Sequence, residues 1–126
     1  GQLTYRHQGL ECVVDLGEWW LLETGLPLPL GINVARRDLG EEALLELSDV
    51  LRESIRAGLD NRAEALEYAL RFGRGLSPEL ADRFVGMYVN ELTEDYGDEG
   101  RQAVRELLRR AEALGAFPEP VRVEFV

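Results

Sequence analysis

The sequence predicts an α/β chain, in which a β-rich N-terminal region is joined through a proline-containing hinge to a mostly helical C-terminal region. Residues 10–16 contain the apolar run Cys-Val-Val, which is typical of a short strand. Pro27 and Pro29 lack amide donors and have a fixed φ, so we expect residues 26–31 to form an extended connector. From Glu41 onward, apolar residues recur at spacings of three and four, which is the helical period.

A short helix is expected before the connector, over residues 17–23. Asp15 is placed to cap its N-terminus, and Gly25 is placed to end it. Trp19 and Trp20 are adjacent and therefore point about 100° apart on a helix. We expect one ring to pack inward and the other to cover an edge or a neighbouring lobe.

After the connector, residues 30–37 are predicted to form a buried strand. The apolar residues Ile32 and Val34 support a strand, and Gly31 allows another backbone to approach closely. The polar residues 36–38 are expected to close it before a turn and the first long helix.

The remainder of the chain is expected to be helical. One stripe of the first long helix, whose burial is expected to stabilise the fold, consists of Leu44, Leu47, Leu51, Ile55 and Leu59. Asn61 is placed to cap the next helix, Ser77 the one after it, and residues 90–96 are expected to form a loop. The last helix is predicted to start at Gly97, bury Val104, Leu107, Leu108, Ala111 and Leu114, and stop at Gly115. The alternating residues 121–125 predict an edge strand.

Composition excludes several classes of function. The net charge is −10 and every basic residue is Arg, so clustered positive charge for nucleic-acid binding is not expected. Cys12 is the only cysteine, which excludes an internal disulfide and a thiolate metal cage, and we interpret it as a small apolar strand residue. No signal peptide or membrane-spanning segment is recognisable, so the default expectation is a cytoplasmic protein with no membrane partner.

No common catalytic motif is present. The chain has no glycine-rich phosphate-binding loop, no pair of histidines at metal-binding spacing and no G-x-S-x-G nucleophile elbow. The acidic pairs at residues 41–42 and 98–99 fall at predicted helix starts, where the helix dipole favours negative charge. His7 is the single histidine, but it lacks an acid at an orienting spacing and is interpreted as an exposed turn residue.

Several sequence stretches resemble a known family, the 1,4-dihydroxy-6-naphthoate synthases of the futalosine route of menaquinone biosynthesis. These stretches are DLGEWW at 15–20, TGLPLPLG at 24–31, RRDLG at 36–40, YVNELT at 88–93 and GDEG at 97–100. The resemblance runs along essentially the whole chain but corresponds only to the C-terminal half of the family. It implies the two-lobed fold of periplasmic solute-binding proteins.

The resemblance also implies an activity. The complete enzyme would be a lyase that converts cyclic dehypoxanthinyl futalosine to 1,4-dihydroxy-6-naphthoate and dihydroxyacetone, without a metal or an organic cofactor. The family's proposed base is a histidine in a His-Glu pair that precedes the stretch corresponding to residues 1–5, and that pair is absent here. No catalytic residue is therefore assigned. We expect the chain to be a fragment that is inactive alone and to have the N-terminal half of the same enzyme as its partner.

Within this two-lobed fold, residues 1–25 are expected to end one lobe, residues 26–31 to form the hinge crossing, and residues 32–126 to supply the C-terminal part of the other lobe. Ligands of such folds bind in the crevice beside the crossing strands. The predicted contacts with the small-molecule substrate are Pro27, Leu28, Pro29, Leu30, Gly31 and Asn33.

Two alternatives remain open at this point. One is chorismate dehydratase, an enzyme of related fold from the same pathway. The other is a non-catalytic solute-binding protein of the same architecture. The N-terminal half would distinguish them, since a signal peptide favours transport and a strand ending in His-Glu favours the synthase.

Overall fold

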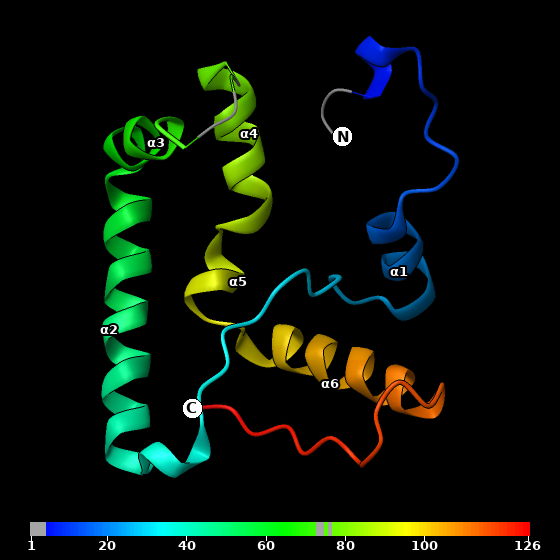
Figure 1. Cartoon of the computed structure of the whole chain (residues 1–126), viewed down its shortest axis with the longest axis vertical. Helices are drawn as coiled ribbons and strands as arrows, with labels where there is room; N and C mark the ends of the chain where they lie inside the picture. Colours follow the sequence, from blue (N-terminus) through cyan, green and yellow to red (C-terminus); the bar gives the residue numbers. More distant parts are fainter. Residues whose placement is uncertain (1–4, 73–74, 76) are drawn as a thin grey trace. The chain divides into compact units, whose positions relative to one another are not determined.

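The computed structural model describes residues 5–72, 75 and 77–126, and these residues form helices joined by irregular segments (Figure 1). In chain order, the helices are η1 (Tyr5–Gln8), α1 (Leu16–Thr24), η2 (Arg37–Leu39), α2 (Glu41–Asp60), α3 (Arg62–Leu70), α4 (Pro78–Tyr88), α5 (Glu91–Glu94) and α6 (Gly97–Ala113). The expectation that the chain is mostly helical after the hinge is confirmed. No strand occurs among the described residues, so the predicted strands at residues 10–16, 30–37 and 121–125 are wrong for this chain.

The missing strands have a common physical reason. A strand exists only where its backbone N–H and C=O groups bond to a neighbouring strand. Between described residues, no backbone–backbone hydrogen bond involves residues 28–35 or 117–126, although the Arg122 carbonyl accepts from Arg37 Nη2 at 3.0 Å. An apolar pattern shows that a segment is suited to a strand. It does not show whether a neighbouring strand is present to pair with it.

The chain divides into two units, which are described separately below. Unit 1 comprises Gly1–Val13 and Asp49–Asp95, and unit 2 comprises Val14–Ser48 and Tyr96–Val126. The assignment of residues 1–25, 26–31 and 32–126 to lobes and hinge stays a prediction.

In unit 1, α3 packs against α4. The Arg62 guanidinium joins the two helices, because its Nε lies 2.7 Å from Asp82 Oδ1 and its Nη2 donates to the Asp82 carbonyl at 3.1 Å. Ser77 caps α4 as predicted, accepting from the backbone N–H of Leu80 at 3.3 Å. Asn61 precedes α3, but its side chain donates to the Ala57 carbonyl at 2.8 Å and does not cap the new helix.

The predicted loop at residues 90–96 contains a helical turn, α5. Asn90 Oδ1 accepts from the Leu92 N–H at 3.0 Å, and the Asn90 N–H donates to Thr93 Oγ1 at 3.1 Å. This reciprocal capping box stabilises a turn too short to be recognised from apolar periodicity. The Arg56 side chain forms an ion pair with Glu94 at the end of this turn.

The helix α2 has the predicted bounds but not the predicted burial. None of its five stripe residues is fully buried, and Leu47 and Leu51 are 40% and 38% exposed. The helical period fixes which residues share a face, whereas burial requires a second element to cover that face.

In unit 2, the most deeply buried apolar side chains come from α1, the turn after it and α6. They are Trp20, Leu26, Ala103 and Val104. Leu114 was expected to face inward but is 86% exposed. It lies after the last turn of α6, immediately before Gly115, whose φ of +73° is the left-handed conformation expected at a helix stop.

The C-terminal tail of unit 2 has irregular structure and retains the predicted alternation. Val121, Val123 and Phe125 are half-buried, whereas the residues between them are exposed. The Phe125 ring meets the Tyr96 ring edge-on at a centroid distance of 6.0 Å, and the Arg105 guanidinium lies 5.1 Å from the Phe125 centroid. The tail thus packs through side chains on one face rather than as an edge strand.

Candidate functional site

The candidate site begins with α1, which fixes the entry to the proline-containing connector. Asp15 Oδ1 accepts from the backbone N–H groups of Gly17 at 2.8 Å and Glu18 at 3.2 Å, which confirms the predicted cap. Gly25 ends the helix with φ of +70°, as expected. The helix begins at Leu16, one residue before the predicted start.

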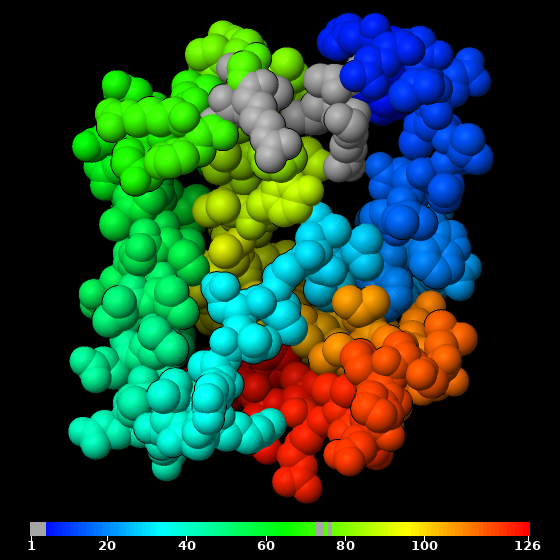
Figure 2. All heavy atoms as spheres, in the orientation of Figure 1, coloured from blue at the N-terminus to red at the C-terminus, as the bar shows by residue number. Residues whose placement is uncertain are grey.

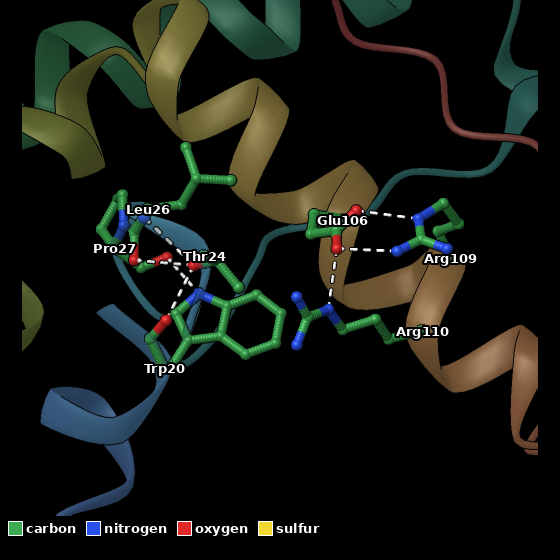
Figure 3. A network of polar contacts seen from close by, with 7 residues as sticks. All are labelled: Trp20, Thr24, Leu26, Pro27, Glu106, Arg109 and Arg110. Carbon is green, nitrogen blue, oxygen red and sulfur yellow. Dashed lines mark hydrogen bonds and ion pairs between the residues drawn. The ribbon is translucent and has the colours of Figure 1, made fainter. Parts of the chain in front are cut away.

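Trp20 attaches the connector to α1 (Figure 3). Its indole Nε1–H donates to the Pro27 carbonyl at 3.1 Å, and the ring is almost completely buried. Thr24 completes the turn, because its Oγ1 donates to the Trp20 carbonyl at 2.8 Å and accepts from the Leu26 N–H at 3.1 Å. The expectation that one of the adjacent indoles packs inward is confirmed for Trp20. Trp19 is 47% exposed, and the expectation that the second ring covers an edge or a neighbouring lobe stays a prediction.

The Trp20 ring is also covered by a charged cluster on α6. The Arg110 guanidinium carbon lies 5.1 Å from the ring centroid, a cation–π distance, while Arg110 Nε donates to Glu106 Oε1 at 2.7 Å. Arg109 donates to both oxygens of Glu106 at 2.8 Å (Figure 3). Hydrogen bonds from Arg109 and then Arg110 stabilise the carboxylate, and they lower the pKa of Glu106 to about 2.

The six predicted substrate contacts lie along one stretch whose exposure increases with distance from Trp20. Pro27, Leu28 and Pro29 are half-buried, Leu30 is 60% exposed, and Gly31 and Asn33 are exposed. Atoms of the cyan segment that continues from this stretch are visible on the face drawn in Figure 2. Sequence proximity alone brings these residues together, and their role in binding substrate stays a prediction.

A separate depression of about 520 Å³ lies in the N-terminal part of unit 1. It is lined by Tyr5, Arg6, Gly9, Leu10, Glu11 and Cys12, and by none of the predicted substrate contacts. His7 is exposed on η1, in agreement with its interpretation as a surface residue. Cys12 is exposed in an irregular segment, so its interpretation as a strand residue is wrong.

The acidic pairs at residues 41–42 and 98–99 occupy the first turns of α2 and α6, as predicted. Across the described ranges, no group of three or more His, Cys, Asp or Glu side chains is arranged to hold a metal ion. Among the helices that the structure describes, none combines the length and apolar character needed to cross a membrane. The proline-containing stretch, residues 26–33, is therefore kept as the candidate site.

Two features of this site were not recognised from the sequence. The i, i+4 spacing of Glu106 and Arg110 could have predicted their ion pair. No sequence signal predicts that the indole of Trp20 bonds the carbonyl of Pro27, because this contact depends on the path of the chain after Gly25.

The class of protein follows from comparison with known families. The model of a family described as menaquinone biosynthesis matches residues 1–113, and the chain belongs to this family. The resemblance to the 1,4-dihydroxy-6-naphthoate synthases is thereby confirmed.

Individual relatives make the match more specific. The chain is 44% identical over 117 residues to 1,4-dihydroxy-6-naphthoate synthase from Streptomyces coelicolor, covering 93% of this chain and 42% of that one. It is 46% identical over 120 residues to the synthase of the same name from Thermus thermophilus, covering 94% and 44% of the two chains. A crystal structure of protein AF1704 from Archaeoglobus fulgidus superposes with a TM-score of 0.85 at 45% identity, covering 93% and 44%. The chain thus spans less than half the length of these relatives.

Proposed function

We propose that this chain is the C-terminal portion of a 1,4-dihydroxy-6-naphthoate synthase that converts cyclic dehypoxanthinyl futalosine to 1,4-dihydroxy-6-naphthoate and dihydroxyacetone. The observation that carries the proposal is identity of 44% and 46% to two synthases over nearly the whole of this chain. In this proposal the complete enzyme is a cytoplasmic lyase with the two-lobed fold of periplasmic solute-binding proteins.

The geometry of the connector supports a hinge that also faces substrate. Its start is held by the hydrogen bond from Trp20 to Pro27, and its continuation from Leu30 is exposed. Two prolines restrict the conformations between these points. In the complete enzyme, Pro27, Leu28, Pro29, Leu30 and Gly31 form an apolar wall for the aromatic part of the substrate, and the Asn33 amide supplies a polar contact.

The chain itself lacks an evident base for the reaction. His7 is exposed on η1. A histidine that abstracts a proton is normally held by a second group in a site from which water is excluded. We therefore assign the base to the N-terminal portion of the enzyme, which would be the partner of this chain.

A product assay with cyclic dehypoxanthinyl futalosine tests the proposal. The chain would be assayed alone, and after refolding together with the N-terminal portion of the Thermus thermophilus synthase, with chromatography detecting naphthoate. We expect product only from the mixture, and the N-terminal portion alone is the control. A His7→Ala variant should retain activity in the mixture.

Three results would contradict parts of this proposal. Product from the chain alone would show that the base lies within it. Loss of activity in His7→Ala, with complex formation intact, would assign the base to His7. Absence of product from a stable, folded mixture would refute the synthase assignment.

A further inference from the structure

The start of the apolar wall, residues 27–31, is held by a buried side chain of α1. The Trp20 indole Nε1–H donates to the Pro27 carbonyl at 3.1 Å, and Trp20 and the neighbouring Leu26 are only 3% and 8% exposed. Pro27 has no N–H, so its carbonyl is the single backbone group through which hydrogen bonding can hold this residue. The indole of Trp20 therefore fixes the point from which the wall extends.

The restricted backbone carries this orientation along the wall. Pro27 and Pro29 have a fixed φ, and each confines the residue before it to extended conformations, so residues 26–29 have few alternatives. Farther along, no backbone–backbone hydrogen bond between described residues involves residues 30–35, and Leu30 is 60% exposed. The direction of the wall is thus set where Pro27 is held.

The orientation of the indole is supported in turn by Arg110 on α6. The Arg110 guanidinium carbon lies 5.1 Å from the Trp20 ring centroid, and its Nε donates to Glu106 Oε1 at 2.7 Å (Figure 3). A guanidinium held by a carboxylate stabilises the ring against which it lies in one orientation. Hydrogen bonds from Arg109 and then Arg110 lower the pKa of Glu106 to about 2, so the carboxylate is ionised and the support is present at neutral pH.

We infer that Arg110 is a positioning residue for substrate binding, because it holds the indole of Trp20, which holds Pro27 and with it the apolar wall. The inference rests on the proposed function, in which this wall contacts the aromatic part of the substrate. The contact exists both before and during the reaction, so displacement of the wall weakens binding of substrate and transition state to a similar extent. Such a loss raises KM and leaves kcat unchanged.

Steady-state kinetics with cyclic dehypoxanthinyl futalosine test this role. The enzyme is the mixture of this chain with an excess of the N-terminal portion of the Thermus thermophilus synthase. We expect Arg110→Gln to raise KM by about fivefold and to leave kcat within about twofold. Arg110→Lys, which retains the positive charge over the ring, should restore KM to within about twofold of the wild-type value.

Arg105 provides the matched control. It lies on the same helix, and its guanidinium carbon is also 5.1 Å from a ring centroid, that of Phe125 in the tail. Arg105→Gln therefore removes an equivalent cation–π contact that does not lead to the wall. KM and kcat of this variant should both stay within about twofold of the wild-type values.

A second pair of variants tests the next contact in the same series. Trp20→Phe removes the donor to Pro27 without changing α6 and should also raise KM by about fivefold, whereas Trp19→Phe should not. Circular dichroism of each variant would verify its folding. The Trp20 pair decides the question if Arg110→Gln does not fold.

The kinetic constants separate positioning from a purely structural role. A variant that only loses folded enzyme has a lower apparent kcat and an unchanged KM. This result for Arg110→Gln or Trp20→Phe, or an equal rise in KM for Arg105→Gln, would overturn the inference and leave the synthase assignment standing. Absence of product from a stable, folded wild-type mixture would overturn both.

Discussion

Replacement of Trp20 by Phe is expected to destabilise the chain, whereas the same replacement at Trp19 is expected to have almost no effect. The two residues are neighbours in α1, yet Trp20 is 3% exposed and Trp19 is 47% exposed. Trp20 Nε1 also donates to the Pro27 carbonyl at 3.1 Å. The comparison keeps the chemical change constant and varies only the environment.

The expected magnitude follows from two losses. Removal of the indole N–H costs about 1 kcal/mol for the hydrogen bond to Pro27. The smaller ring leaves unfilled volume beneath Arg110, which costs about another 1–2 kcal/mol. We therefore expect Trp20→Phe to lower the free energy of unfolding by about 2–3 kcal/mol, and Trp19→Phe by less than about 0.5 kcal/mol.

Urea denaturation followed by far-ultraviolet circular dichroism would measure these values. Because the chain contains only two tryptophans, each variant also leaves a single fluorescent indole. Emission from Trp20 in the Trp19→Phe variant should be shifted to shorter wavelength than emission from Trp19 in the reciprocal variant. Equal destabilisation by both substitutions, or indistinguishable emission, would refute the assignment of Trp20 as the buried anchor of the connector.

Two further substitutions test other parts of the structure. Glu106→Gln should reduce stability at neutral pH, because the charge-assisted bonds from Arg109 and Arg110 to the carboxylate are lost. The pKa of Glu106 is lowered from 4.5 to about 2, so the difference in stability from the wild type should diminish as the pH falls from 4.5 to about 2. Urea midpoints that differ equally at both ends of this pH range would contradict the explanation. Ser77→Ala should lower stability by about 1 kcal/mol, because the Leu80 N–H loses its side-chain acceptor, whereas Ser77→Asp, which restores an acceptor, should recover most of the loss in the same assay.

Local sequence signals determined the ends of the helices and several of their caps. Asp15 and Ser77 cap helices because their side-chain oxygens reach N–H groups two or three residues away, and Gly25 and Gly115 stop helices because they readily adopt positive φ. Each of these devices acts within a few residues. The sequence therefore contains all the information needed to place them.

The sequence also determined membership of the menaquinone biosynthesis family, whose model matches residues 1–113. It placed the proline-containing connector before the first long helix. It did not reveal the bond from Trp20 to Pro27, which depends on how the chain turns after α1.

Only the tertiary structure decided which apolar patterns are buried and which extended segments pair. The stripe on α2 and the apolar residues of the predicted strand at residues 30–37 are each properties of one segment, and the sequence shows both. Burial and strand pairing are properties of two segments in contact, and the described residues supply no second backbone for residues 28–35. The periodicity of apolar residues specifies which of them share one face of an element, whereas a neighbouring element determines whether that face is buried.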